Sequence, residues 1–226
     1  MLMQKKMECS DTSSLTAMEQ SLGEQIANAV SHGVGALAAL IAAPVLIVSA
    51  VQKGSAWGIV GVSVFAVTTI LLYLTSTLYH ALPTCKAKQL FKILDHGAIF
   101  LLIAGTYTPF TLGVLRGTWG WTLFGLVWTL ALFGIILKSL DGAKDSKAST
   151  VVYLVMGWLV VIAIKPMLMH VSAWGLFWLV SGGLAYSAGV IFFALDGKVK
   201  YAHFVWHLFV IAGTSCHFFA VLGHSS

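Results

Sequence analysis

The chain has 226 residues, of which 58% are hydrophobic and only 9% are charged, and its formal net charge is +5. A soluble domain carries about 25% charged residues, so this chain has too little polar surface to fold in water. Its lysines and its arginine are scattered in ones, twos and threes, which suits short loops between membrane spans and argues against a nucleic-acid-binding surface. The composition predicts an integral membrane protein surrounded by the lipid bilayer, and no pattern in the sequence indicates a protein partner.

The first 24 residues are polar and precede the first apolar stretch. No apolar segment follows their lysines, so we expect a cytoplasmic or interfacial N-terminal arm rather than a cleavable signal peptide. At the end of this arm, Ser21 and Glu24 have the spacing of a capping box, which marks a helix start. We assign residues 1–24 to the arm and residues 25–226 to a single transmembrane domain. The three cysteines are odd in number and far apart, which argues against a disulfide framework or a cysteine metal site: Cys9, Cys85 and Cys216.

Apolar stretches long enough to cross a bilayer follow the arm. A helix needs about 20 apolar residues to span the hydrocarbon core. Seven stretches meet that length, with the fifth the shortest: 28–51, 57–82, 94–115, 118–138, 150–168, 172–195 and 202–222. The sequence therefore predicts an all-α membrane protein that is a bundle of seven transmembrane helices.

The loop charges predict how this bundle sits in the membrane. With seven spans, the N-terminal arm and the second, fourth and sixth loops share one side, and that side holds ten of the 13 Lys and Arg residues. The opposite side holds the other three. Because cytoplasmic loops carry an excess of Lys and Arg, we expect the N-terminus in the cytoplasm and the C-terminus outside.

Polar side chains gather at one depth in three of the predicted spans. Ser76 and His80 lie near the end of the second span, Asp95 begins the third, and His203 and His207 begin the seventh. The predicted orientation places all five at the cytoplasmic ends of their helices. Since ionisable groups inside a membrane are costly, they mark functional sites by default.

The spacing of these residues suits a metal site. His203 and His207 are one helical turn apart, so both imidazoles can bind one ion, and His80 adds a third nitrogen. Three protein ligands and a water are typical of a catalytic zinc site. Asp95 would then orient the water or accept its proton, and Ser76 would donate a hydrogen bond to the water or to a substrate carbonyl.

Simpler interpretations exist for each residue taken alone. A pair of histidines four residues apart also hydrogen-bonds neighbouring helices, and a single histidine such as His80 also contacts lipid headgroups. Asp95 would also cap the third span, since a carboxylate is favourable near a helix N-terminus. A Ser76–His80–Asp95 triad is a further alternative, although it leaves the pair in the seventh span unexplained. The shared depth of the groups favours the metal site.

Three other histidines are not assigned to this site. His32 has Asn28 one turn before it, so a hydrogen bond between helices is its default role. His96 lies about 100° around the helix from Asp95. His217 is ten residues beyond His207, which is about 15 Å along a straight helix, so it cannot share the same ion.

Six segments, in order from the first span to the seventh, resemble the haemolysin III family, the bacterial branch of the progestin and adiponectin receptor superfamily. They cover nearly the whole chain beyond the N-terminal arm. The segments are EQIANAVSHG (24–33), STLYHALP (76–83), DHGAIFLLIAGTYTPF (95–110), MGW (156–158), GGLAYSAGVIFF (182–193) and HFVWHLFVIAGTSCHF (203–218).

The resemblance implies a seven-helix bundle in the bacterial inner membrane, with its N-terminus in the cytoplasm. It also implies a zinc ion held by His80, His203 and His207, with Asp95 near the bound water and Ser76 beside it, and this chain has all five residues. The wider superfamily includes alkaline ceramidases, which cleave a lipid amide. The bacterial branch is described as haemolytic and as acting in membrane lipid homeostasis.

Three functions follow as hypotheses. The first is a zinc-dependent membrane hydrolase that attacks a lipid amide or ester from the cytoplasmic side. The second is a sensor or regulator of membrane state without enzymatic activity, in which zinc pins the second helix to the seventh. The third is a pore-forming haemolysin, although the spans show no polar stripe wide enough to line an aqueous channel.

Overall fold

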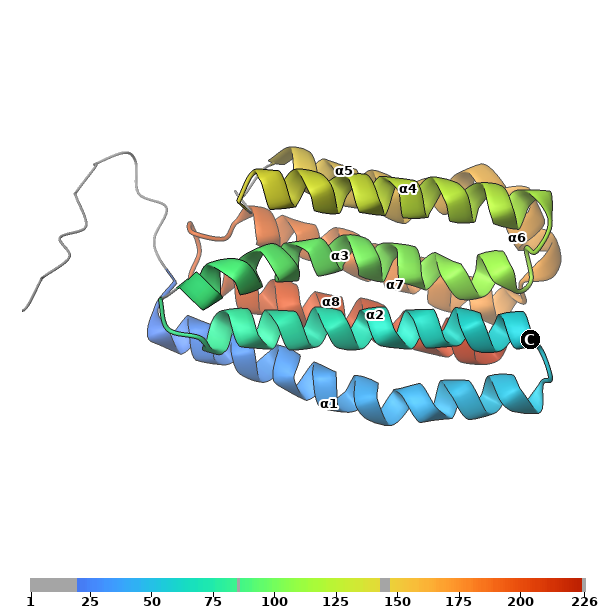
Figure 1. The fold of residues 1–226 in the computed structure, drawn as a ribbon, viewed down its shortest axis with the longest axis horizontal. Coiled ribbons are helices and arrows are strands. Elements are labelled where there is room, and N and C mark those ends of the chain that lie inside the picture. The colour runs from blue at the N-terminus through green and yellow to red at the C-terminus, as the bar shows by residue number, and fades with distance from the viewer. Residues whose placement is uncertain (1–19, 85, 143–146, 225–226) are drawn as a thin grey trace, which may run out of the picture.

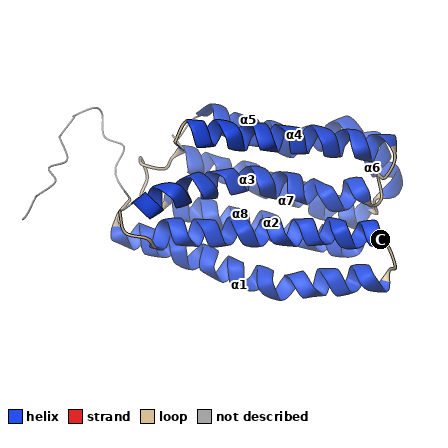
Figure 2. Ribbon diagram, in the orientation of Figure 1, coloured by secondary structure: helices blue, strands red, loops and turns tan. Residues whose placement is uncertain are grey.

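A computed structural model describes residues 20–84, 86–142 and 147–224. Within these residues every regular element is a helix, and the loops lie at the two ends of the bundle (Figure 1, Figure 2). Seven helical segments are long and apolar enough to cross a membrane. The predicted all-α bundle of seven spans is therefore confirmed, and the protein is a multi-pass membrane protein. The predicted orientation of its termini stays a prediction.

Six spans are single helices and the fifth is interrupted. The single helices are α1 (Leu22–Gln52), α2 (Ala56–Ala81), α3 (Lys86–Leu112), α4 (Thr118–Leu140), α7 (Ala173–Ala194) and α8 (Ala202–His224). The fifth span consists of α5 (Lys147–Trp158), the 3-10 segment η1 (Leu159–Ala163) and α6 (Ile164–His170). The helices α1 and α3 begin earlier than the apolar stretches predicted, at 22 rather than 28 and at 86 rather than 94, because their first turns are polar.

The start of α1 is fixed by the predicted capping box. The hydroxyl of Ser21 accepts a hydrogen bond from the Glu24 N–H at 3.3 Å, and the Glu24 carboxylate accepts one from the Ser21 N–H at 2.8 Å. Both orphan donors are thereby satisfied. Residues 22–24, which the sequence assigned to the arm, belong to α1, and the rest of the predicted arm up to residue 19 lies outside the described residues.

Glycines let neighbouring helices approach closely. In α7, a side chain at Gly182 would clash with His217 of α8, and one at Gly189 would clash with Phe209. At Gly183, by contrast, an added Cβ would make only an ordinary contact with Trp158. Gly182 and Gly189 therefore allow the close packing of α7 on α8.

The interrupted fifth span is held by a tyrosine of α3. The hydroxyl of Tyr107 lies 2.9 Å from the carbonyl oxygens of Met156 and Gly157, to which it donates, and accepts a hydrogen bond from the N–H of Val160 at 2.9 Å. Backbone groups freed by a break in a membrane helix need such partners, because the hydrocarbon offers none. Tyr107 thus makes the interruption compatible with a bilayer.

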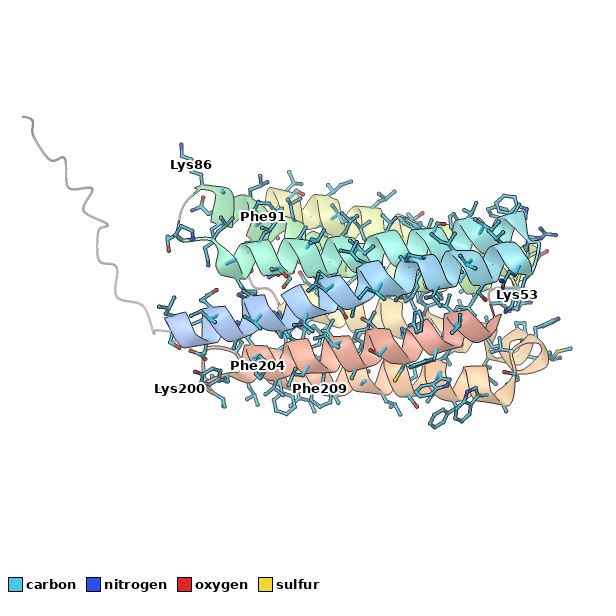
Figure 3. All side chains as sticks on the ribbon, turned by 90° about the horizontal axis from the view of Figure 1, so that it is seen from below. Lys53, Lys86, Phe91, Lys200, Phe204 and Phe209 are labelled. Atoms are coloured by element: carbon cyan, nitrogen blue, oxygen red, sulfur yellow. The ribbon has the colours of Figure 1, made fainter. Side chains whose placement is uncertain are left out.

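The polar residues of interest meet at one end of the bundle, where α1 and α8 begin and α2 ends. Lys86 at the start of α3 and Lys200 in the α7–α8 turn lie at this end, and Lys53 after α1 lies at the opposite end (Figure 3). In the same view α1 and α8 lie side by side, and the two helices are in contact. The first turns of α1 therefore face both the last turn of α2 and the first turns of α8.

Candidate metal centre

Three buried histidines from two helices converge at this end of the bundle. His80 is in the last turn of α2, and His203 and His207 are in the first two turns of α8. One nitrogen of each ring lies within 4.8 Å of those of the other two. The rings are 3%, 8% and 1% exposed, so solvent does not surround them. The cluster of three histidines that the sequence spacing predicted is confirmed, because the three residues lie close enough to hold a metal ion.

Each of these rings has an oxygen partner at Nδ1. The Nδ1 of His80 lies 3.0 Å from the side-chain oxygen of Gln25, and the Nδ1 of His203 lies 2.8 Å from the Asp196 carboxylate. The Nδ1 of His207 lies 3.2 Å from the carbonyl oxygen of Asn28. An amide oxygen, a carboxylate and a carbonyl only accept hydrogen bonds, so in all three rings Nδ1 carries the proton and donates.

This assignment leaves Nε2 of each neutral ring as the nitrogen with a free lone pair. For His80 that nitrogen is buried and has no hydrogen-bond partner among the described residues. A buried acceptor without a partner is costly, and a ring nitrogen of this kind beside two further imidazoles suits a cation. Because histidines that bind metals usually donate their other N–H to an oxygen, the arrangement fits a transition-metal ion such as zinc.

An apolar cavity brings further groups to the same place. Ser76, Asp95, His203 and His207 all line it. Ser76 is 1% exposed and Asp95 is 7% exposed, and the hydroxyl of Ser76 has no hydrogen-bond partner among the described residues. A buried hydroxyl and a buried carboxyl thus lie in one cavity with two of the three histidines, as expected for groups that act on a bound molecule.

Two of the simpler interpretations are wrong. Asp95 does not cap a helix, because α3 begins at Lys86 and Asp95 lies well inside it. His80 is too deeply buried to contact lipid headgroups. The Ser76–His80–Asp95 triad is not assembled among the described residues, since Nδ1 of His80 donates to Gln25 and Nε2 of His80 has no hydrogen-bond partner. His207 does bond a neighbouring helix, α1, but through Nδ1, which keeps Nε2 available.

The carboxylate of Asp196 belongs to the turn between α7 and α8, outside the spans. Its burial alone would raise its pKa, but hydrogen bonds from His203 and Gln20 outweigh burial and hold the pKa below its ordinary value. Asp196 is therefore a carboxylate at neutral pH and accepts the proton of His203.

The remaining buried histidines are differently placed. His32 stacks on His207 with ring centroids 3.5 Å apart and planes 7° apart. The lone pair of a ring nitrogen lies in the plane of its ring, so the lone pairs of two stacked rings lie in parallel planes and do not converge on one point; His32 and His207 would therefore not hold the same ion. The ring nitrogens of His32 have no hydrogen-bond partner of normal geometry among the described residues, and its predicted bond between helices stays a prediction. His96 and His217 line the same cavity, although the sequence set both apart from the site.

Sequence patterns missed the outer hydrogen-bond partners of the three histidines. Gln25 and Ser31 lie on α1, and the Ser31 hydroxyl is a second partner of the His207 Nδ1, at 3.2 Å. Asp196 lies in the predicted loop between the sixth and seventh spans, and no pattern in the sequence connected it with the histidines. Residues of these types are common at helix starts and in turns, so their presence there does not indicate a site. The one available signal was weak: Gln25 and Asn28 lie one helical turn apart, shortly before His32.

Known proteins place the chain in a family. A family profile described as haemolysin-III related matches residues 20–218. The chain belongs to this family. It is 47% identical to hemolysin-3 of Bacillus cereus over 211 residues, which cover 93% of this chain and 96% of the relative. It is 48% identical to the hemolysin-3 homolog of Bacillus subtilis (strain 168) over 202 residues, covering 89% and 94% of the two chains.

More distant similarity extends beyond the bacterial haemolysin-III proteins. The chain is 28% identical to the human monocyte to macrophage differentiation factor over 210 residues, covering 88% of this chain and 83% of the relative. That protein belongs to the progestin and adiponectin receptor superfamily, so the resemblance seen in the sequence motifs is confirmed. No solved structure matches the chain significantly.

Proposed function

We propose that this haemolysin-III protein is a zinc-dependent membrane hydrolase that cleaves a lipid amide or ester and so contributes to membrane lipid homeostasis. The observation that carries the proposal is the shared cavity of Ser76, Asp95, His203 and His207. A metal that only pins helices together needs no buried hydroxyl and carboxyl beside an apolar cavity. Three imidazole ligands with an open fourth position are typical of catalytic zinc.

A zinc ion bound by the three histidines would lower the pKa of a water to about 7 and polarise a carbonyl group. Asp95 accepts a proton from the water that attacks the carbonyl carbon. It then passes this proton to the leaving nitrogen or oxygen as the C–N or C–O bond breaks, which gives a fatty acid and an amine or an alcohol. The hydroxyl of Ser76 donates to the carbonyl oxygen, where negative charge develops.

The cavity wall supports a substrate with a long apolar chain. Leu72 of α2, Ile99 and Leu102 of α3 and Val210 of α8 contribute to it. Such a chain prefers these side chains to water by about 0.8 kcal/mol for each buried methylene. A lipid in the leaflet is a source of such chains, and the excess of Lys and Arg supports a position of the centre at the cytoplasmic face of the bacterial inner membrane.

The test is hydrolysis by the purified, zinc-loaded protein. Ceramides and glycerophospholipids are supplied in mixed micelles, and released fatty acid is measured by mass spectrometry. Asp95→Asn and Ser76→Ala should lower the rate about 10²- to 10⁴-fold while zinc stays bound. Asp141→Asn and Ser139→Ala, at exposed positions of the same residue types, should keep the wild-type rate. Unchanged hydrolysis by Asp95→Asn would sink the proposal.

A structural metal in a membrane sensor is the second candidate. Its support is that the three histidines join α2 to α8 and that their outer partners add α1, so one ion would pin three helices. In that case Asp95→Asn and Ser76→Ala behave as wild type. His80→Ala, in contrast, lowers the melting temperature as strongly as a chelator does.

A further inference from the structure

A glutamine just before α1 contacts the outer partner of every histidine in the candidate metal centre. The side-chain oxygen of Gln20 accepts hydrogen bonds from Gln25 Nε2 at 3.1 Å and from Asn28 Nδ2 at 3.0 Å. Its side-chain nitrogen donates to both carboxylate oxygens of Asp196, at 3.0 and 3.2 Å. Gln25, Asn28 and Asp196 are the residues whose oxygens receive the protons of the three rings.

The hydrogen bonds of this network all run in one consistent direction. His80 donates to the oxygen of Gln25, the nitrogen of Gln25 donates to Gln20, and the nitrogen of Gln20 donates to Asp196. His203 donates to Asp196 from the other side. A carboxylate has no proton to give, so both branches end at Asp196, and this fixes the direction of the bonds from His80 and from His203.

The direction of these bonds determines which ring nitrogen is free. If His203 carried its proton on Nε2, the lone pair of Nδ1 would face the Asp196 carboxylate, and the two would repel. If the side chain of Gln20 were turned over, its NH₂ group would face the NH₂ groups of Gln25 and Asn28, and its oxygen would face the carboxylate. The observed arrangement gives Gln20, Gln25 and Asp196 compatible partners and leaves Nε2 of His80 and His203 for a metal. The backbone carbonyl of Asn28 does the same for His207, while the side-chain oxygen of Asn28 has no hydrogen-bond partner among the described residues.

Asp196 differs from the other members of the network because it is charged. Gln20, Gln25 and Asn28 contribute neutral amides, whereas the carboxylate bonds directly to a ring that would hold the metal. A carboxylate on the outer N–H of a metal-binding histidine orients the ring and makes it a stronger base. His203 should therefore depend on Asp196 more than His80 depends on Gln25.

We propose that Gln20 and Asp196 are positioning residues of the metal centre, which hold the outer partners of all three histidines in the order that presents three Nε2 atoms to one ion. The inference rests on the proposed zinc site. It assigns a role in metal binding to the segment through which the chain enters α1 and to the turn that connects α7 to α8.

The test is a zinc titration of the full-length protein in detergent, in competition with a chromophoric chelator. Asp196→Asn and Gln20→Ala should each weaken zinc binding about 10- to 100-fold, and Asp196→Glu should recover part of the loss. The matched controls are Asp141→Asn and Gln52→Ala, both at exposed positions outside the network. In the cobalt-substituted protein, the visible absorption bands of Asp196→Asn should shift, because the ligand field of His203 changes.

The melting temperature separates positioning from a merely structural role. Positioning predicts that the metal-free variants melt close to the metal-free wild type and that the rise in melting temperature on adding zinc becomes smaller. An equal fall in the metal-free and zinc-loaded forms, with wild-type zinc affinity and an unchanged cobalt spectrum, overturns the inference. If Asp196→Asn does not fold, the zinc affinity and the melting temperatures of Gln20→Ala decide between the two roles by the same criteria. A wild-type protein that binds no zinc overturns the proposed function itself, which is a different result.

Discussion

Five of the six histidines that are buried among the described residues fall into two groups, which differ in their hydrogen bonds rather than in their burial. His80, His203 and His207 each donate Nδ1–H to an oxygen and bring their other nitrogens together. His32 and His217 are equally buried, but His32 has no partner of normal geometry among the described residues, and His217 bonds only to the carbonyl oxygen of Leu179. Burial alone therefore does not indicate a metal ligand. The indication comes from two features together: an oxygen that accepts the proton of one ring nitrogen, and the closeness of the three rings to one another.

The two groups also differ in the element that supports them. The outer partners of the convergent group come from the first turns of α1 and from the α7–α8 turn. His217, further along α8, packs against Gly182 in the interior of the bundle. The convergent group thus lies at the water-facing end, where polar partners are available, and His217 lies where helix packing dominates.

The largest expected effect distinguishes these groups directly. His207→Ala should abolish stable zinc binding, because two imidazoles and water hold an ion far less tightly than three imidazoles. His217→Ala should retain zinc. Zinc content after dialysis against a chelator measures both variants. Equal loss of zinc from the two would remove the distinction drawn here between the two groups.

A second expected effect concerns the part of the bundle remote from the ligands. Tyr107→Phe should lower the stability of the protein by about 1–3 kcal/mol, because backbone groups of Met156, Gly157 and Val160 lose their partner inside the membrane. Its zinc affinity should not change. Thermal unfolding in detergent and zinc titration check the two statements, with Tyr201→Phe as an exposed control. A weaker zinc affinity in Tyr107→Phe would show that the two regions are coupled.

The ring of His32 should have a smaller effect on the metal centre. Its stacking on His207 is worth about 0.5–1.5 kcal/mol, so His32→Ala should weaken zinc binding about three- to tenfold. His32→Phe keeps a flat ring at this position and should bind zinc nearly as the wild type does. If both variants lost zinc completely, His32 would have to be a ligand, contrary to the stacked geometry.

The smallest expected effect is that of Ser31. Ser31→Ala removes one of two oxygens near the Nδ1 of His207 and leaves the carbonyl oxygen of Asn28 in place. We expect a loss of zinc-binding free energy of about 0.5 kcal/mol, at the low end for one hydrogen bond. Calorimetric titration resolves it. A loss as large as that of Asp196→Asn would mean that the Ser31 hydroxyl, rather than the Asn28 carbonyl, is the main acceptor.

The sequence was sufficient to find the cluster of three histidines, because both signals that reveal it are local. His203 and His207 are one helical turn apart, and His80 is at the end of a span whose depth follows from apolar length and loop charge. The same reasoning placed Asp95 and Ser76 near them. The start of α3 was predicted too late, because the first turns of this helix are polar and lie outside the apolar stretch that marks the span.

The outer network was not predictable in the same way. Gln20 and Asp196 are 176 residues apart, and they meet only because α1 packs beside α8. The interruption of the fifth span likewise depends on Tyr107 of another helix. Such features follow from the packing of distant segments, about which the periodicity of a single segment contains no information.

The most direct test of the central claim is X-ray absorption at the zinc edge of the purified wild-type protein. The proposed centre predicts about one zinc ion per chain, with three nitrogen ligands at about 2.0–2.1 Å and one further oxygen. In His207→Ala this signal should be lost. A wild-type protein that carries no zinc, or zinc with sulfur or only oxygen ligands, would contradict the assignment of His80, His203 and His207 as a metal centre.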